Sequence, residues 1–178
     1  MNLSSEVNFI PVNIAILSIS DTRDLSNDKS GDIIQDRALK AGHSLHERLV
    51  VKDDFNEITQ QLQLWVNDNT VDVVITTGGT GLTGRDVTVE AHQSIYEKEI
   101  PGFAIIFAQL SYNKIKASAV QSRACAGVAK GTYLFALPGS PSACIDAWDG
   151  ILKTQLDVRN KPCNFVEIMP RLDEHRRK

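Results

Sequence analysis

The chain alternates between short apolar runs and longer segments whose apolar residues recur every three to four positions. Four runs predict strands: Val12–Ile19, Leu45–Val51, the run that begins at Val73, and Thr132–Leu137. Nearly continuous apolar character is typical of parallel strands that are covered on both faces. The pattern predicts an α/β fold, with a mostly parallel sheet between two layers of helices in a three-layer α/β/α arrangement.

The segments between these runs carry apolar stripes at helical spacing. The predicted helices are one that ends at Gly42, one over Glu57–Val66, one from Thr88 to about Tyr96, one over Gly102–Tyr112 and one over Ser142–Leu156. The first follows a polar loop, Asp24–Gly31, which is long enough to be a flap. Asp54 and Thr88 are candidates for the N-caps of the second and third. The tail Asn160–Pro170 is predicted to add an edge strand.

The predicted helix over Gly102–Tyr112 has hardly any polar face. Its apolar residues include Phe103, Ile105, Ile106 and Phe107. A helix that is apolar all round has to be buried on every side. In a domain of this size an interface between copies of the chain would bury it, and so would a position beneath a flap.

Four glycines stand within seven residues directly after the third predicted strand. They are Gly78, Gly79, Gly81 and Gly84, and Arg85-Asp86-Val87-Thr88 follows as the start of a helix. Glycine readily adopts positive φ, which lets successive backbone N–H groups converge on an anion, and a helix N-terminus favours negative charge. An ordinary strand-to-helix turn needs only one or two glycines. The pattern therefore favours a loop that holds a phosphate.

Two known phosphate-binding motifs resemble this loop but fail in detail. Gly79–Gly84 fits the G-x-G-x-x-G pattern of dinucleotide-binding proteins, but it follows the third predicted strand rather than the first. The same glycines have the spacing of a Walker A loop, which needs Lys and then Ser or Thr where this chain has Arg85 and Asp86. A nucleoside triphosphatase is excluded on this ground. A nicotinamide dehydrogenase rests on the glycine spacing alone and predicts that the cofactor's fluorescence is quenched on titration.

Polar residues follow the predicted strands at the edge where ligands of open α/β sheets bind. Ser20 follows the first strand, Asp53 follows the second, and the glycine loop with Asp86 follows the third. If these strands are parallel, Asp53 and Asp86 stand around one crevice. Both could instead cap helices, although Asp54 and Thr88 suit that task at least as well.

A second strand-loop-helix element follows the fourth predicted strand. Pro138-Gly139-Ser140-Pro141 leads into a helix, with Ser140 as its cap and Pro141 in its first turn. Its backbone donors offer another place for an anion, so the two loops suit a ligand with two anionic ends. Arg123 is either a contact to such an anion or a surface cation.

Composition narrows the function classes. Residues 1–178, with 42% hydrophobic content, fit one domain, with 1–11 as a flexible arm and 170–178 as a polar tail. The net charge of -3 and the pI near 5.8 argue against a nucleic-acid-binding surface. No charged and apolar leader pattern opens the chain, and no apolar run approaches the roughly 18 residues of a membrane span. A soluble cytoplasmic protein is expected, with no membrane or nucleic-acid partner.

The cysteines and histidines carry no recognisable site. Cys125, Cys144 and Cys163 are widely spaced and form no C-x-x-C motif, so neither a disulfide framework nor a zinc site is predicted, and buried free thiols are expected. The four histidines are scattered, and no G-x-S-x-G motif accompanies them. No histidine is assigned a catalytic role.

Three stretches together resemble one family closely. They are Thr76-Thr77-Gly78-Gly79-Thr80-Gly81, Gly84-Arg85-Asp86-Val87-Thr88 with Glu90-Ala91, and Leu137-Pro138-Gly139-Ser140-Pro141. The combination is similar to the MoaB/Mog family of molybdenum cofactor biosynthesis proteins. Ser18–Asp21, Lys52–Asp54 and Pro162–Glu167 resemble its MoaB branch, so the match covers nearly the whole chain.

The resemblance implies a molybdopterin-binding fold that assembles as a homo-oligomer, a trimer or a hexamer. Active members of the family transfer AMP from Mg-ATP to the terminal phosphate of molybdopterin and release pyrophosphate. The resemblance makes Asp53 and Asp86 the catalytic acidic pair, which would hold Mg²⁺ with ATP. The substrate-binding candidates are Ser20, Thr77, Gly78, Gly79, Thr80, Gly81, Ser122, Arg123, Pro138, Gly139, Ser140 and Pro141.

The resemblance leaves a second hypothesis open. Where a cell holds two paralogues of this family, one copy catalyses adenylyl transfer, while the other only binds molybdopterin or serves as a partner of other molybdenum cofactor biosynthesis proteins. The motifs do not separate these two cases, although the intact acidic pair favours an enzyme. Release of pyrophosphate from ATP distinguishes them.

Overall fold

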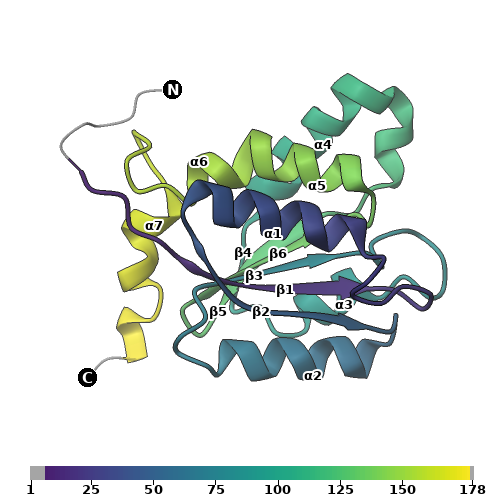
Figure 1. Ribbon diagram of the computed structural model, residues 1–178, viewed down its shortest axis with the longest axis horizontal. Coiled ribbons are helices and arrows are strands. Elements are labelled where there is room, and N and C mark those ends of the chain that lie inside the picture. Colours follow the sequence, from purple (N-terminus) through teal and green to yellow (C-terminus); the bar gives the residue numbers. More distant parts are fainter. Residues whose placement is uncertain (1–6, 177–178) are drawn as a thin grey trace.

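The computed structural model describes residues 7–176 (Figure 1). Within this range a six-stranded sheet in the order β2-β1-β3-β6-β5-β4 forms the middle layer. Its strands are β1 (Asn13–Ile19), β2 (Ser44–Val51), β3 (Val73–Thr77), β4 (Lys98–Glu99), β5 (Cys125–Ala129) and β6 (Thr132–Leu137). β2, β1, β3 and β6 are parallel, and β5 pairs antiparallel with both β6 and β4.

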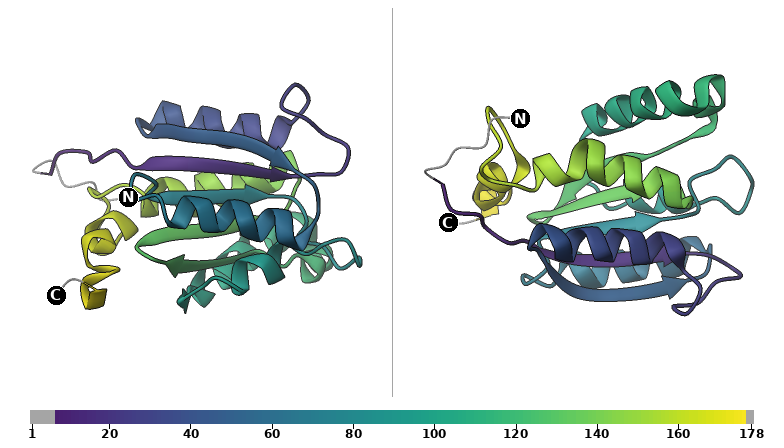
Figure 2. Two further views of the ribbon diagram at one scale, coloured as in Figure 1. Left: turned by 90° about the horizontal axis from the view of Figure 1, so that it is seen from below. Right: turned by 45° about the horizontal axis from the view of Figure 1, so that its top comes forward.

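Helices cover both faces of the sheet (Figures 1 and 2). On one face lie α1 (Lys29–Ala41), α4 (Pro101–Ile115) and α5 (Pro141–Ala147), and on the other lie α2 (Phe55–Val66) and α3 (Thr88–Gln93). The shorter elements are η1 (Lys116–Gln121), η2 (Trp148–Leu152), α6 (Lys153–Gln155), α7 (Phe165–Ile168), η3 (Met169–Arg171) and η4 (Glu174–Arg176). The predicted three-layer α/β fold with a mostly parallel sheet is confirmed.

Two hydrophobic cores, one on each face, explain the continuous apolar runs. In β1, Ile14 and Ile16 join the core beneath α1 and α5, whereas Ala15 and Leu17 join the core above α2. All four side chains are fully buried. Because successive residues of a strand point to opposite faces, a strand that is covered on both sides buries side chains on both faces and is mostly apolar.

Two of the predicted helix caps, Asp54 and Ser140, are confirmed. Asp54 caps α2 by accepting hydrogen bonds from the backbone N–H groups of Asn56 and Glu57, at 2.9 and 3.0 Å. Ser140 caps α5 through the N–H of Ala143, at 3.2 Å. Both caps fix the direction in which the chain leaves the carboxyl ends of the parallel strands.

Two helix starts differ from the prediction. α1 begins at Lys29, because Asp28 caps it by accepting from the N–H of Gly31, so the preceding loop is shorter than the predicted Asp24–Gly31 segment. Thr88 is not an N-cap: Val87 occupies that position, and α3 has no side-chain cap. α3 also ends at Gln93 rather than near Tyr96.

The prediction misses β4 and β5 and is wrong about the tail. β5 consists of small residues, Cys-Ala-Gly-Val-Ala, whose hydrophobic pattern is too weak to predict a strand. It forms a strand because it pairs with β6 through a tight turn at Lys130-Gly131. Within Asn160–Pro170 the structure has the short helix α7, capped by Asn164, in place of an edge strand. Phe165 of α7 packs against the ring of Tyr133, which anchors this segment beside the core.

The helix predicted to be buried on every side is half exposed in the single chain. Phe103, Phe107 and Ser111 are the buried residues of α4. Four of its large apolar side chains are exposed, namely Ile105 at 68%, Ile106 at 48%, Tyr112 at 58% and Ile115 at 54%. No flap of the described chain covers this face of α4.

The ends of the described chain pack at the side of the sheet away from the strand-end loops (Figure 1). Phe9 contacts the ring of His43 and lies beneath the guanidinium of Arg159, so this part of the predicted arm, 1–11, is held against the domain. Residues 1–6 and 177–178, parts of the predicted arm and polar tail, lie outside the described residues. Within residues 7–176 no helix is both long and apolar enough to span a bilayer.

Cysteine burial agrees with the prediction for one residue. Cys144 is buried, Cys125 is half-buried, and Cys163 is exposed. The expectation of buried free thiols is therefore wrong for Cys163, which lies in the loop before α7.

Candidate functional site

Four strand ends meet at one edge of the sheet. β1 pairs in parallel with both β2 and β3, and β3 pairs in parallel with β6, so the loops that follow these strands gather at the end remote from the termini (Figure 1). A Cβ placed on Gly139, in the loop after β6, would lie 3.0 Å from the Cα of Gly78 in the loop after β3. The two loops that were predicted to hold anions therefore touch.

The glycine loop is held at both of its ends by the backbone. The N–H of Gly78 donates to the carbonyl of Leu137, and the carbonyl of Gly79 accepts from the N–H of Thr88, each at 3.0 Å. Both glycines have positive φ, 107° at Gly78 and 63° at Gly79. This conformation lets the chain turn sharply between β3 and the segment that carries Asp86.

The guanidinium of Arg123 holds the glycine loop through hydrogen bonds to its backbone. Its Nε donates to the carbonyl of Gly81 at 2.8 Å, and one Nη donates to the carbonyl of Asp86 at 3.1 Å. The guanidinium also forms an ion pair with Glu90 on α3. The two predicted alternatives for Arg123 were an anion contact and a surface cation, whereas the structure uses it to hold the loop in shape.

Asp86 is fixed by its own loop. One carboxylate oxygen, Oδ2, accepts hydrogen bonds from the N–H and the Oγ1 of Thr83, at 2.8 and 2.7 Å. Partial burial raises the pKa of Asp86, but the hydrogen bonds from Thr83 and from the backbone of Gly81 outweigh it and hold the pKa below its ordinary value. Asp86 is therefore a preorganised carboxylate at neutral pH.

Asp53 lies at the end of β2 and faces the same loop. A Cβ on Gly79 would lie 2.7 Å from its Oδ1, so its carboxylate sits directly against the glycine loop. Its own hydrogen bond is long, 3.5 Å from the N–H of Val87. Burial raises the pKa of Asp53, and the negative charges of Asp86 and Asp21 raise it further.

Three carboxylates thus surround the crevice, and the guanidinium of Arg85 lies beside them. Arg85 donates to both carboxylate oxygens of Asp21, at 2.7 and 2.8 Å. This contact holds the pKa of Asp21 below its ordinary value. Because Asp53 and Asp86 still repel each other, a cation between them would lower the energy of the site.

Six of the other predicted residues line two further cavities. Ser20, Thr77 and Gly139 line a chamber of about 200 Å³ between the loops after β1 and β6. A second cavity, of about 180 Å³, lies against α4 and α5 and is lined by Ser122, Pro138 and Ser140 among others. Pro141 is the first residue of α5. Thr80 is buried in the glycine loop, at 4% exposure.

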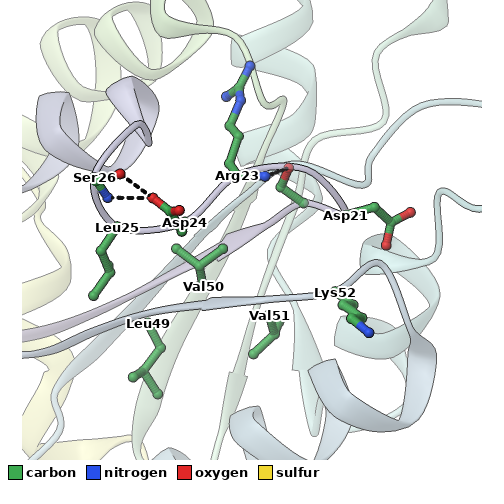
Figure 3. A pocket seen from close by; sticks show the side chains of 10 residues that line it. Asp21, Arg23, Asp24, Leu25, Ser26, Leu49, Val50, Val51 and Lys52 are labelled. Atoms are coloured by element: carbon green, nitrogen blue, oxygen red, sulfur yellow. Dashed lines mark hydrogen bonds between the residues drawn. The ribbon is translucent and has the colours of Figure 1, made fainter.

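A hollow of about 640 Å³, with Asp21 and Lys52 in its lining, lies beside the acidic crevice. It opens between the loop after β1 and the edge strand β2 (Figure 3). Leu25 lies on the same side of the loop as Leu49 and Val50, whereas the side chain of Arg23 extends away from β2. An Nη of Arg23 is 3.5 Å from the carbonyl of Gly139, so this residue reaches towards the loop after β6.

Comparison with known proteins places the chain in a family. A family described as "Probable molybdopterin binding domain" matches residues 15–158, which include the glycine loop, both acidic residues and the loop after β6. The chain belongs to this family.

Relatives of this molybdopterin-binding domain protein support the branch predicted from sequence. The chain is 45% identical over 157 residues to "Molybdenum cofactor biosynthesis protein B" of Escherichia coli (strain K12), covering 88% of this chain and 92% of the relative. A crystal structure of "Molybdenum cofactor biosynthesis protein B" is similar at a TM-score of 0.83 and 36% identity, covering 94% and 98% of the two chains. The "tungsten cofactor synthesizing protein MoaB" of Pyrococcus furiosus matches at a TM-score of 0.72 and 28% identity, with the same coverage. The predicted resemblance is confirmed.

Sequence reasoning missed a buried ion pair beneath the chamber of this molybdopterin-binding domain. Asp28 accepts hydrogen bonds from Ser18 Oγ and from the guanidinium of Arg48, the latter at 2.9 Å, and its side chain is 1% exposed. Burial raises the pKa of Asp28, but the contacts from Ser18, Gly31 and Arg48 outweigh it and lower the pKa overall. The sequence did contain a signal for part of this arrangement, because aspartate is a favoured N-cap residue and Asp28 directly precedes α1.

This pair predicts a pH-dependent loss of stability in Asp28→Asn. Because the folded-state pKa lies below the unfolded value of about 4, Asp28 stabilises the fold above that pH, and the contribution is lost as the pH falls. Removing one partner of a buried pair costs about 3 kcal/mol. Urea denaturation should show this deficit at pH 7 and a smaller one at pH 3. Asp36→Asn, which breaks an exposed pair with Lys40, should match the wild type at both pH values.

A chain of buried polar contacts includes His92 of α3. His92 is fully buried and contacts Thr76 Oγ1 and Tyr96 Oη, each at 2.9 Å, and Tyr96 Oη lies 3.4 Å from Cys125 Sγ. Burial lowers the pKa of His92 to about 3, so the ring is neutral. The chain of contacts links β3, α3 and β5 behind the glycine loop.

Proposed function

We propose that this protein acts in molybdenum cofactor biosynthesis by binding molybdopterin and transferring AMP from Mg-ATP to its terminal phosphate. In this reaction an oxygen of the terminal phosphate forms a bond to the α-phosphorus of ATP, the bond between the α-phosphorus and the bridging oxygen breaks, and pyrophosphate leaves. The observation that carries the proposal is the convergence of Asp53 and Asp86 on a glycine loop at the sheet edge. The family membership and the names of the relatives support it.

The loops supply what phosphoryl-type chemistry needs from a protein, which is mainly positioning and electrostatic stabilisation. The glycine loop offers backbone N–H groups to the phosphate of molybdopterin, and the loop after β6, with the start of α5, offers donors to the nucleotide. Gly78 and Gly139 are in contact, so the two phosphates would meet where these loops touch. Proximity of this kind converts a bimolecular step into one within a single complex.

The acidic residues suit a magnesium ion that is shared with the substrate. Mg²⁺ is commonly bound by one or two carboxylates together with substrate phosphates. Within residues 7–176 the carboxylate of Asp53 accepts a single, long hydrogen bond, on Oδ1, and Thr83 contacts only Oδ2 of Asp86. When bound, the ion would neutralise charge on the phosphates as the bond to the leaving pyrophosphate breaks. Asp53 and Asp86 would hold it and orient it.

The proposal is tested with the purified protein, molybdopterin and Mg-ATP. We expect pyrophosphate release that depends on molybdopterin, together with formation of adenylylated molybdopterin, measured by a coupled assay and by mass spectrometry. Molybdopterin binding without either product would contradict the enzyme and establish the alternative, a paralogue that binds or delivers the pterin. Quenching of nicotinamide cofactor fluorescence on titration would favour the dehydrogenase.

We also propose that the protein is a homo-oligomer, a trimer or a hexamer, in which α4 is covered by another copy. Ile105, Ile106, Tyr112 and Ile115 on α4 and Val120 on η1 are exposed large apolar residues on neighbouring elements. An apolar patch of this kind marks an interaction surface. Ile105→Asp should lower the mass measured by light scattering to that of a smaller assembly. Leu64→Asp, at an exposed leucine on α2, is the matched control and should leave the mass unchanged.

A further inference from the structure

A buried hydroxyl without a partner lies beside the acidic crevice. Thr88, the first residue of α3, is fully buried. In the part of the chain that the structure describes, its Oγ1 makes no hydrogen bond. Hydroxyl groups in protein interiors nearly always find a partner, because leaving one unpaired is costly.

This hydroxyl and the carboxylate of Asp53 face the same point. A Cβ placed on Gly79 would lie 2.3 Å from Thr88 Oγ1, and 2.7 and 3.0 Å from the two carboxylate oxygens of Asp53. Glycine is required at position 79 partly because both side chains occupy the space that a larger residue would need. The N–H of Thr88 already donates to the carbonyl of Gly79, which holds Thr88 over the loop.

Asp53 needs a donor of this kind. Among residues 7–176 its carboxylate accepts one hydrogen bond, from the N–H of Val87 at 3.5 Å, and the charges of Asp86 and Asp21 repel it. Asp86, by contrast, is held by two short hydrogen bonds from Thr83. A carboxylate that orients a cation needs partners that fix its own direction.

Packing does not account for threonine at position 88. Valine has nearly the same shape, would fill the same space and would leave no unpaired hydroxyl. A position that is fully buried and carries an unpartnered hydroxyl therefore points to a use of that hydroxyl in a bound state.

Building on the proposed function, we propose that Thr88 is a positioning residue for Asp53. When Asp53 turns to hold a cation on the phosphates of the nucleotide, Thr88 Oγ1 donates a hydrogen bond to its carboxylate and fixes its direction. The hydroxyl acts through Asp53 and does not touch the nucleotide.

The test uses Mn²⁺ with ATP as the probe, followed by electron paramagnetic resonance and calorimetry on the intact protein. Loss of a group that orients a metal-binding carboxylate weakens metal affinity by about 10-fold or more. We expect that loss in Thr88→Val, near wild-type binding in Thr88→Ser, and unfolding of Thr88→Val at a denaturant concentration no lower than that of the wild type. Thr59→Val is the matched control, because Thr59 Oγ1 on α2 is also buried and makes no hydrogen bond within residues 7–176. It should bind as the wild type does.

A double-mutant cycle tests whether Thr88 acts through Asp53. In an Asp53→Asn background, Thr88→Val should cause no further loss of affinity. Wild-type binding by Thr88→Val, an equal loss in both backgrounds, or a loss that Thr88→Ser shares would each overturn the proposal.

The design separates this inference from the proposed function. Binding of Mn²⁺ and ATP is measured without molybdopterin. If the wild type binds them but releases no pyrophosphate when molybdopterin is added, adenylyl transfer is contradicted, and the test of Thr88 still stands. A wild type that transfers AMP while Thr88→Val is unaffected in binding overturns the role of Thr88 alone. A wild type that binds no Mn²⁺ with ATP overturns both.

Discussion

Asp86→Asn is expected to lower the rate of pyrophosphate release by more than about 100-fold, a loss of the size seen when groups that hold or orient a catalytic metal are removed. Asparagine keeps the shape of aspartate, and its carbonyl oxygen can still accept from Thr83, whose two contacts with Asp86 shape the loop. The negative charge is what disappears. Molybdopterin binding, for which we propose the glycine loop, should change little. Calorimetry measures the binding, and a coupled pyrophosphate assay measures the rate.

The matched control for Asp86→Asn is Asp149→Asn. Asp149 is a half-exposed carboxylate in η2 that pairs with Arg37 of α1 at 3.1 Å. This variant therefore removes one negative charge from a pair that includes no residue of the crevice. It should keep the wild-type rate. Equal turnover in wild type and Asp86→Asn would contradict the metal-binding role. Parallel loss of turnover and of molybdopterin binding would show that Asp86 only holds the loop in shape.

The parts of the fold that were predicted correctly are those whose signal is local. β1 carries a continuous apolar run because both of its faces are covered, and that run is legible in the chain. The caps Asp54 and Ser140 are legible for the same reason, since a cap acts within three residues. The crevice followed from one further step, because parallel strands bring their carboxyl ends to the same edge of a sheet.

The parts that were missed depend on contacts between distant residues. β5 is a run of small residues, and what makes it a strand is its pairing with β6. Nothing in the sequence around Arg123 indicates a partner, yet its guanidinium donates to the carbonyl of Gly81 in the glycine loop, about 40 positions earlier. Asp28 and Arg48 form a buried pair that joins α1 to β2. No pattern within a short window specifies such partners.

The glycines of the loop illustrate the same limit, because the sequence does not say which of them is indispensable. Gly79 has φ of 63°, and a Cβ there would lie within 3 Å of Thr88 Oγ1 and Asp53 Oδ1. Gly84 has nothing within 4 Å of the corresponding position. The four residues were predicted as one motif, but the structure gives them different tasks.

Gly79→Ala should therefore lose binding of both Mg-ATP and molybdopterin by more than about 10-fold, as expected when a group that orients a metal-binding carboxylate is displaced. Its strained backbone should also cost about 1–3 kcal/mol of stability. The added methyl group would push against Asp53 and Thr88, so the loop and the carboxylate have to move apart. Calorimetric titration with each ligand and urea denaturation measure the two effects.

Gly84→Ala serves as the control in the same loop and should bind both ligands as the wild type does. If Gly79→Ala also binds normally, the close approach of Asp53 to the loop has no role in ligand binding. If Gly84→Ala is as damaging as Gly79→Ala, flexibility of the whole loop is what matters. Because the two variants add the same methyl group to the same loop, a difference between them isolates the contact of Gly79 with Asp53 and Thr88.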